Sequence, residues 1–115
     1  ALEMARGSDT TVKLDMARVP LIGGVRDLAA QGMVTGASGR NWAAYGDEVR
    51  LADALTPQDK ALLTDPQTSG GLLVACSAGA VDEVLAVFRR HGFDAAAEIG
   101  EIVPAQAGGV RLQVD

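Results

Sequence analysis

The stretch that most constrains the fold is residues 63–75, where a polar, glycine-ended loop leads directly into an apolar run. Pro66 disfavours the helical conformation at Asp65, so a helix that precedes this stretch must end before it. Residues 72–76 form a short, continuous apolar run, which is typical of a strand buried on both faces. The sequence therefore predicts a loop that is held by a buried strand and turns its polar groups outward.

The loop itself offers two interpretations. Thr68 and Ser69 supply hydroxyl groups and Gly70 and Gly71 supply accessible N–H groups, a combination that can bind an oxyanion. The spacing G-x-x-x-x-G-K-[ST] is absent, and a strand rather than a helix is expected to follow, so a nucleotide-hydrolase phosphate loop is excluded. A tight structural turn is the alternative, because Gly, Pro, Ser and Asp are the usual turn residues. The residues alone leave both interpretations open.

Length and composition bound the remaining function classes. A chain of 115 residues has room for one domain with one core. The net charge is −5 and the basic residues are scattered, which argues against binding to nucleic acid or to an anionic membrane. No apolar run approaches the roughly 20 residues that a membrane-spanning helix needs. One cysteine excludes an intrachain disulfide and favours a cytoplasmic origin.

Periodicity and helix-breaking residues predict the order of the elements. The best-defined signals are the helix start Thr56–Asp59, with its capping hydroxyl and proline, and an apolar stripe at helical spacing that begins at Val81. The predicted elements are a helix tail at Ala1–Arg6, a half-buried strand at Thr11–Met16, a helix at Leu21–Gln31, a loop at Gly32–Gly46 with at most a helical turn around Trp42, a strand at Val49–Leu51, a short helix from Pro57, a strand at Gly71–Cys76, a helix at Ser77–His91, and a hairpin of Glu98–Val103 with Val110–Val114.

The strand–helix–strand–strand order of residues 71–114 resembles half of a ferredoxin-like unit. Together with the earlier elements it predicts an α/β (α+β) domain, in which helices pack on a mixed, mainly antiparallel sheet. A fold of this class does not by itself determine a function, so the function must be argued from individual residues.

Four residues are candidates for chemistry, and two of them, Arg40 and Asp65, have two readings each. The guanidinium of Arg40 can grip a phosphate, or it can cap a carbonyl or pair with a carboxylate such as Asp47. Asp65 can bind a metal or orient an amide, or it can form a turn before Pro66. His91, the only histidine, fits a helix-end role, and Cys76 fits an inert buried thiol.

The central stretch also resembles a known signature. Residues 65–73, Asp-Pro-Gln-Thr-Ser-Gly-Gly-Leu-Leu, resemble that of the selenophosphate synthetases (selenide, water dikinases). Ala1–Ser8 resembles the helix that follows the last metal-binding aspartate of the family. Val19–Leu21 and Gly36–Asn41 resemble its Pro-containing helix start and its Gly-rich loop ending in Arg-Asn. The resemblance covers nearly the whole chain but only part of the enzyme.

This resemblance implies the C-terminal domain of the aminoimidazole-ribonucleotide-synthetase superfamily. The family uses ATP and magnesium to convert selenide and water to selenophosphate, AMP and phosphate, for selenocysteine and selenouridine synthesis. Its reactive Cys or selenocysteine, its partner Lys and its magnesium aspartates have no match here. We therefore expect residues 1–115 to be one domain without catalytic or metal-binding residues. Residues 1–8 would continue a helix from a missing N-terminal ATP-binding domain, and the isolated chain would be inactive and without cofactor.

In the whole enzyme, which the resemblance implies to be a cytoplasmic homodimer, the polar loops would line the cleft against the ATP-binding domain. The candidates for a substrate- or phosphate-facing role are Arg40, Asn41, Asp65, Gln67, Thr68, Ser69, Gly70 and Gly71. The competing hypothesis is a non-catalytic, ferredoxin-like ligand-binding or regulatory module in which these loops are structural.

Overall fold

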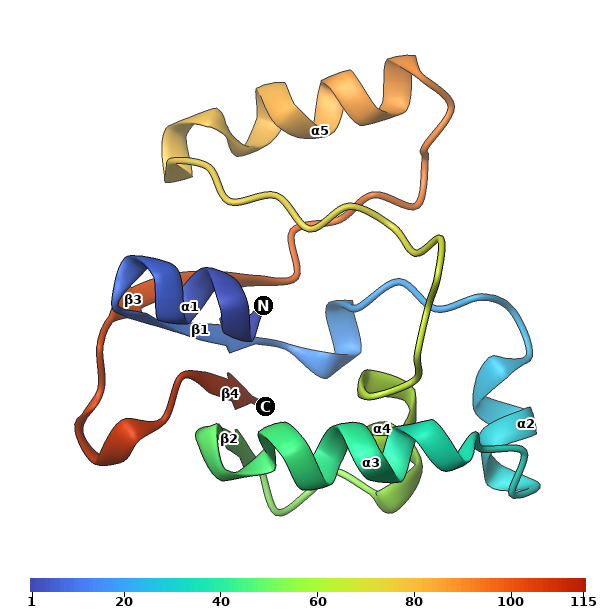
Figure 1. Ribbon diagram of the computed structural model, residues 1–115. Helices are drawn as coiled ribbons and strands as arrows, with labels where there is room; N and C mark the ends of the chain where they lie inside the picture. Colours follow the sequence, from blue (N-terminus) through green and yellow to red (C-terminus); the bar gives the residue numbers. More distant parts are fainter.

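Four strands form one mixed sheet in the order β2-β4-β1-β3 (Figure 1). The computed structural model describes residues 1–115. β1 pairs antiparallel with β3 and parallel with β4, and β4 pairs parallel with β2. The α+β class with a mixed sheet and packed helices is thereby confirmed. The strands are β1 at Thr10–Leu14, β2 at Val49–Leu51, β3 at Gly100–Pro104 and β4 at Leu112–Val114.

Five helices accompany the sheet, and their ends follow local signals. Asp9, in the left-handed conformation with φ 51°, ends α1, and Gly92 with φ 83° follows α5. The longest helices have ten residues, and none is long and apolar enough to cross a bilayer. The helices are α1 at Leu2–Ser8, α2 at Val25–Ala30, α3 at Gly36–Tyr45, α4 at Pro57–Leu63 and α5 at Val81–Arg90.

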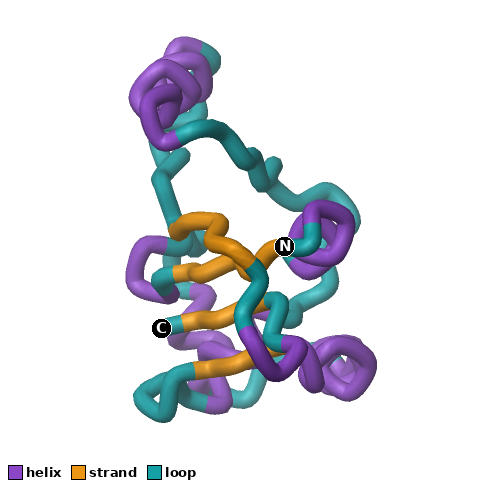
Figure 2. Tube along the Cα trace, turned by 90° about the vertical axis from the view of Figure 1, so that its left-hand side faces the viewer, coloured by secondary structure: helices purple, strands orange, loops and turns teal.

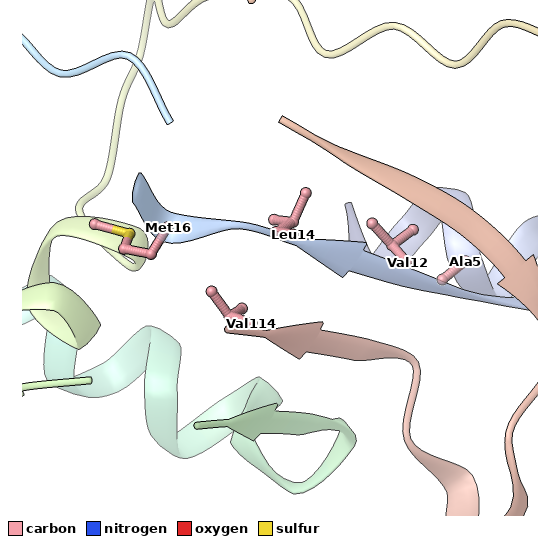
Figure 3. Close-up of a cluster of buried hydrophobic side chains, with 5 residues drawn as sticks. All are labelled: Ala5, Val12, Leu14, Met16 and Val114. Carbon is pink, nitrogen blue, oxygen red and sulfur yellow. The ribbon is translucent and has the colours of Figure 1, made fainter. Parts of the chain in front are cut away.

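The core lies around the central strand β1. Val12 and Leu14 of β1 are buried together with Ala5 of α1, with Val114 of β4, and with Met16, which follows β1 (Figure 3). The alternation predicted for this strand is correct for these apolar residues, which all face the core. The alternation fails at Thr11, which was expected to face outward. Thr11 is fully buried as well, because the segment between β3 and β4 covers that side of β1.

The predicted hairpin of Glu98–Val103 with Val110–Val114 is wrong. β3 and β4 do not pair with each other, because β1 lies between them and bonds to both. Gly108 and Gly109 do supply a turn, with φ values of 85° and 76°, but the connection carries the chain across β1 to its other edge. The sheet is therefore not mainly antiparallel, since two of its pairings are parallel.

The predicted buried strand at Gly71–Cys76 is also not formed. This segment is extended but outside the sheet, and Leu72 is 82% exposed. The thiol of Cys76, expected to be buried, is exposed. Figure 2 shows α5 set apart from the sheet and joined to it by two long loops, of which residues 71–76 form part of one. The strand–helix–strand–strand unit of residues 71–114 is therefore absent.

The apolar character of that segment has a different reason. Leu72–Cys76 and the inner stripe of α5 line a cavity of about 460 Å³ above β1 and β3. The stripe contains Val81, Val84, Leu85 and Phe88, as the helical spacing predicted. A short apolar run is compatible with a strand and with the wall of a cavity, and its composition does not distinguish the two.

Two further predictions need correction. The helix expected at Leu21–Gln31 begins only at Val25, because Gly24 takes a left-handed conformation with φ 82°. The loop expected at Gly32–Gly46 contains the ten-residue helix α3, whose N-cap Thr35 accepts a hydrogen bond from the N–H of Ser38. This cap and the contacts with α4 outweigh the cost of the helical glycines, about 1 kcal/mol each.

Helix α4 provides a test of pH dependence. The carboxylate of Asp59 accepts hydrogen bonds from the hydroxyl (2.7 Å) and the N–H (3.0 Å) of Thr56, and from Arg26 of α2. The Thr56 hydroxyl bond, then the Thr56 N–H bond and then Arg26 hold the pKa of Asp59 below its ordinary value. A lowered pKa stabilises the fold above the unfolded pKa, and the contribution is lost as the pH falls through the folded value.

We therefore expect Asp59→Asn to lower the free energy of unfolding by about 1 kcal/mol at pH 7. The difference from the wild-type chain should shrink as the pH falls below about 4, because the carboxyl of the unfolded wild-type chain takes up a proton there and the folded one follows at lower pH. Urea unfolding of both proteins at pH 7, pH 4 and pH 2.5 measures this difference. A gap that stays constant over this range would contradict the assignment.

Candidate functional site

Helix α3 lies beside α4 (Figure 1), and the polar contacts nearest to the predicted loop join α3 to the end of α4. Asn41 Nδ2 donates to the carbonyl oxygen of Thr64 at 2.9 Å. One turn earlier on α3, the hydroxyl of Ser38 donates to the carbonyl oxygen of Ala61 at 3.4 Å. Ala61 belongs to the last turn of α4 and Thr64 is its C-cap, where carbonyl groups lack the N–H partners of a continuing helix. Side chains of α3 therefore cap the helix that leads into the loop.

Asp65, the first residue of the loop, is in contact with the start of α3. The hydroxyl of Thr35 donates to Asp65 Oδ1 at 3.5 Å. The guanidinium of Arg40 folds back along the same helix, so that its Nη1 would lie 3.6 Å from a Cβ on Gly36. Asp65 and the Arg40 guanidinium therefore both lie beside the first turn of α3. Arg40 is exposed and forms no ion pair, so the predicted alternative of a pair with Asp47 is not found.

A cavity of about 410 Å³ lies next to these contacts, between α1, α3 and one face of the sheet. Asn41, Thr64 and Asp65 form a polar part of its wall, and the first residues of the chain line it as well. Its other wall residues include two aromatic side chains and several aliphatic ones, which is the usual composition of a ligand pocket. These residues are Trp42, Tyr45, Leu14, Val49, Leu51, Leu63, Leu112 and Val114.

The two aromatic residues are held by cations. The ammonium of Lys60 lies 4.9 Å from the centroid of the Trp42 ring, and the Arg6 guanidinium lies 5.7 Å from that of Tyr45. Arg6 also forms an ion pair with Glu48, and the hydrogen bond that Arg6 donates lowers the pKa of the Glu48 carboxyl. Arg6, the one Lys or Arg side chain of this wall, is therefore already paired. Asp65 is exposed and in no ion pair, so its carboxylate is available as a hydrogen-bond acceptor.

The remaining predicted residues lie further along the loop. Residues 67–71 are exposed and line neither of the two cavities, and the chain turns at Thr68–Ser69. The side chain of Gln67 folds against Gly70, where a Cβ would lie 2.6 Å from Gln67 Oε1. Asn41 and Asp65 thus meet at one cavity and Arg40 lies nearby, whereas the hydroxyl and glycine part of the loop is presented to solvent.

Sequence reasoning missed three residues that organise this site: Thr35, Ser38 and Thr64. Thr35, Ser38 and Asn41 are spaced by three residues, so Thr35, the N-cap of α3, lies on the same side of the helix as the other two. That spacing would have identified Thr35 and Ser38 had residues 36–45 been recognised as helical, whereas no such signal marks Thr64, the C-cap of α4.

The residues present do not fit a metal site. No group of three or more His, Cys, Asp or Glu side chains is placed to hold a metal ion. We therefore assign no step of any reaction to a metal ion held by this chain.

Comparison with known proteins shows the family. Residues 1–113 match the family of AIR synthase related protein, C-terminal domain. A protein of Burkholderia orbicola named selenide, water dikinase is 61% identical over 106 residues, which are 92% of this chain and 30% of that protein.

Two further relatives carry the same name. The protein from Burkholderia ambifaria is 63% identical over 102 residues, 89% of this chain and 29% of that protein. The protein from Rhizobium meliloti is 43% identical over 113 residues, 98% of this chain and 32% of that protein. The chain thus spans about 30% of the length of these curated relatives. The resemblance seen in residues 65–73 is confirmed, and the chain belongs to the family of AIR synthase related protein C-terminal domains.

Proposed function

We propose that this domain forms one wall of the substrate cleft of a selenide, water dikinase, an ATP-dependent phosphotransferase. The complete enzyme would convert selenide, ATP and water to selenophosphate, AMP and phosphate in the cytoplasm. The observation that carries the proposal is the meeting of Asn41 and Asp65 at a cavity that the start of the chain also lines. The names of relatives up to 63% identical support the reaction class.

Arg40 is the residue best suited to a phosphate. Its guanidinium is exposed and in no ion pair, so binding a phosphate would not require an existing partner to be displaced. A guanidinium donates two parallel hydrogen bonds to phosphate oxygens. The hydroxyls of Thr68 and Ser69 and the N–H groups of Gly70 and Gly71 would add donors that face solvent here. Phosphoryl transfer depends on such positioning and charge neutralisation.

Asp65 would have a different task. A carboxylate repels a phosphate and accepts hydrogen bonds from hydroxyl or N–H groups. We assign it to a donor group of the nucleotide or to a donor on the facing domain. Neither Asp65 nor Asn41 would carry out bond making or breaking, so the reactive groups would belong to the ATP-binding domain. We expect that domain to be the direct partner of this one, within a homodimer, and the isolated chain to lack turnover.

The proposal is tested in a full-length enzyme that contains this domain. Arg40→Ala, and separately Thr68→Val with Ser69→Ala, should each lower kcat/KM for ATP by about 10- to 100-fold, the loss expected for removed transition-state contacts. Selenide-dependent ATP consumption and phosphorus NMR of selenophosphate provide the two readouts.

Arg50 gives a matched control, because it is also exposed and also forms no ion pair, but it lies on β2. Arg50→Ala should retain wild-type kinetics. If the Arg40 variant behaves like the Arg50 variant, the polar residues of this domain do not take part in ATP use.

A further inference from the structure

Residues 66–76 form no hydrogen bond with the rest of the domain through backbone or side chains. The segment is also exposed along its whole length. Leu72–Cys76 line the cavity beside α5, so the course of the polar part, residues 66–71, is set between that apolar stretch and the end of α4. The end at α4 determines where the predicted phosphate-facing residues begin.

That end is held from one face of α3. Thr35, Ser38 and Asn41 occupy successive turns of this face, and each contacts the exit of α4. Asn41 makes the shortest of the three contacts, at 2.9 Å, and Ser38 is only 3% exposed. The hydroxyl of Thr35 contacts Asp65 itself and also accepts from the Ser38 N–H. Three polar side chains on one rigid element thus hold the exit of α4, in addition to the bonds from Thr64 back to Lys60, and no further hydrogen bond holds residues 66–71.

We propose that Thr35, Ser38 and Asn41 act as a positioning ladder, which sets the direction of the loop Asp65–Gly71 relative to Arg40. Asn41 is the principal positioning residue, since its amide makes the shortest of the three contacts. The inference rests on the proposed function for its effect on catalysis, because it takes the loop to face the substrate cleft. A displacement of about 1 Å in a positioning element can reduce turnover by about 100-fold.

Asn41→Asp is the sharpest variant. It preserves the shape of the side chain but replaces the donor by an acceptor, which would repel the Thr64 carbonyl oxygen. Asn41→Gln retains an amide donor and serves as the conservative variant. The control is Gln58→Glu, because Gln58 is an exposed amide on α4 that makes no side-chain hydrogen bond.

Two measurements on the full-length enzyme separate position from function. Spin labels at Ser69→Cys and Ala44→Cys, with other reactive thiols replaced, report the distance distribution between the loop and α3. Steady-state kinetics on the unlabelled variants report kcat and the KM for ATP. We expect Asn41→Asp to broaden the distance distribution and to lower kcat by about 10- to 100-fold, with a smaller change in KM. Asn41→Gln should recover part of both properties, and Gln58→Glu should change neither.

An unchanged distance distribution in Asn41→Asp would overturn the positioning ladder, whatever the activity. A broadened distribution with wild-type turnover would uphold the ladder and instead contradict the proposed function, because a displaced loop would then have no effect on the reaction. The two hypotheses therefore fail in different measurements.

Discussion

Replacing Gly100 with alanine is expected to lower the free energy of unfolding by about 3 kcal/mol. Gly100 pairs with Leu14 in the antiparallel ladder between β1 and β3. A Cβ at this position would lie 1.9 Å from the carbonyl oxygen of Lys13, where only a shift of the backbone could relieve the clash. Such a shift would break the pairing of β3 with the central strand. Urea unfolding of the domain measures the loss.

Gly39→Ala is the matched control for this experiment. Gly39 lies within α3, and a Cβ there would meet no atom within 4 Å. The substitution should stabilise the domain by up to about 1 kcal/mol, because alanine is the better helix former. Equal effects of the two substitutions would show that β3 does not approach β1 as closely as described.

Replacing Thr11 with valine is expected to cost about 2 to 3 kcal/mol of unfolding free energy. The side chain is 0% exposed, and its hydroxyl donates to the carbonyl oxygen of Val110 at 2.9 Å. The hydroxyl oxygen of Thr11 in turn accepts from the N–H of Gln106 at 3.1 Å. Valine preserves the shape but leaves both backbone groups without this partner. These bonds hold the connection that carries the chain from β3 to β4, so the loss should weaken the whole sheet.

Thr10→Val provides the comparison for this second prediction. Thr10 is the neighbouring strand residue, and its hydroxyl bonds only to the hydroxyl of Ser8 in an exposed contact. Its replacement should change the unfolding free energy by less than about 0.5 kcal/mol. Thr11→Ser should recover much of the loss, since it retains the hydroxyl. Thermal unfolding in which Thr11→Val is no less stable than Thr10→Val would contradict the assignment.

Local signals in the sequence were sufficient for several elements. The cap at Thr56–Asp59 and the apolar stripe of α5 each depend on residues within a few turns, and both are confirmed. Which strands pair with which, by contrast, depends on residues that are far apart in the sequence. β1 pairs with β3 and β4, which lie about 90 or more residues later in the chain, and no local pattern could place it between them.

The candidate site was predicted to a similar extent. Asn41 and Asp65 were identified from the sequence, and the structure places both at one cavity. Thr35 and Ser38 were missed because the glycines at 36 and 39 suggested a loop, whereas the cap and the contacts with α4 make this segment a helix. The Leu72–Cys76 run was misread because an apolar segment that lines a cavity has the same composition as a buried strand.

The central claim is that α3 and the loop Asp65–Gly71 face bound ATP in the complete enzyme. Its most direct test is photo-crosslinking of the full-length protein with an ATP analogue whose γ-phosphate carries the reactive group, followed by mapping of the modified peptides. We predict adducts within residues 36–41 or 65–71 that unlabelled ATP suppresses. Adducts that unlabelled ATP suppresses and that lie only outside this domain would contradict the claim.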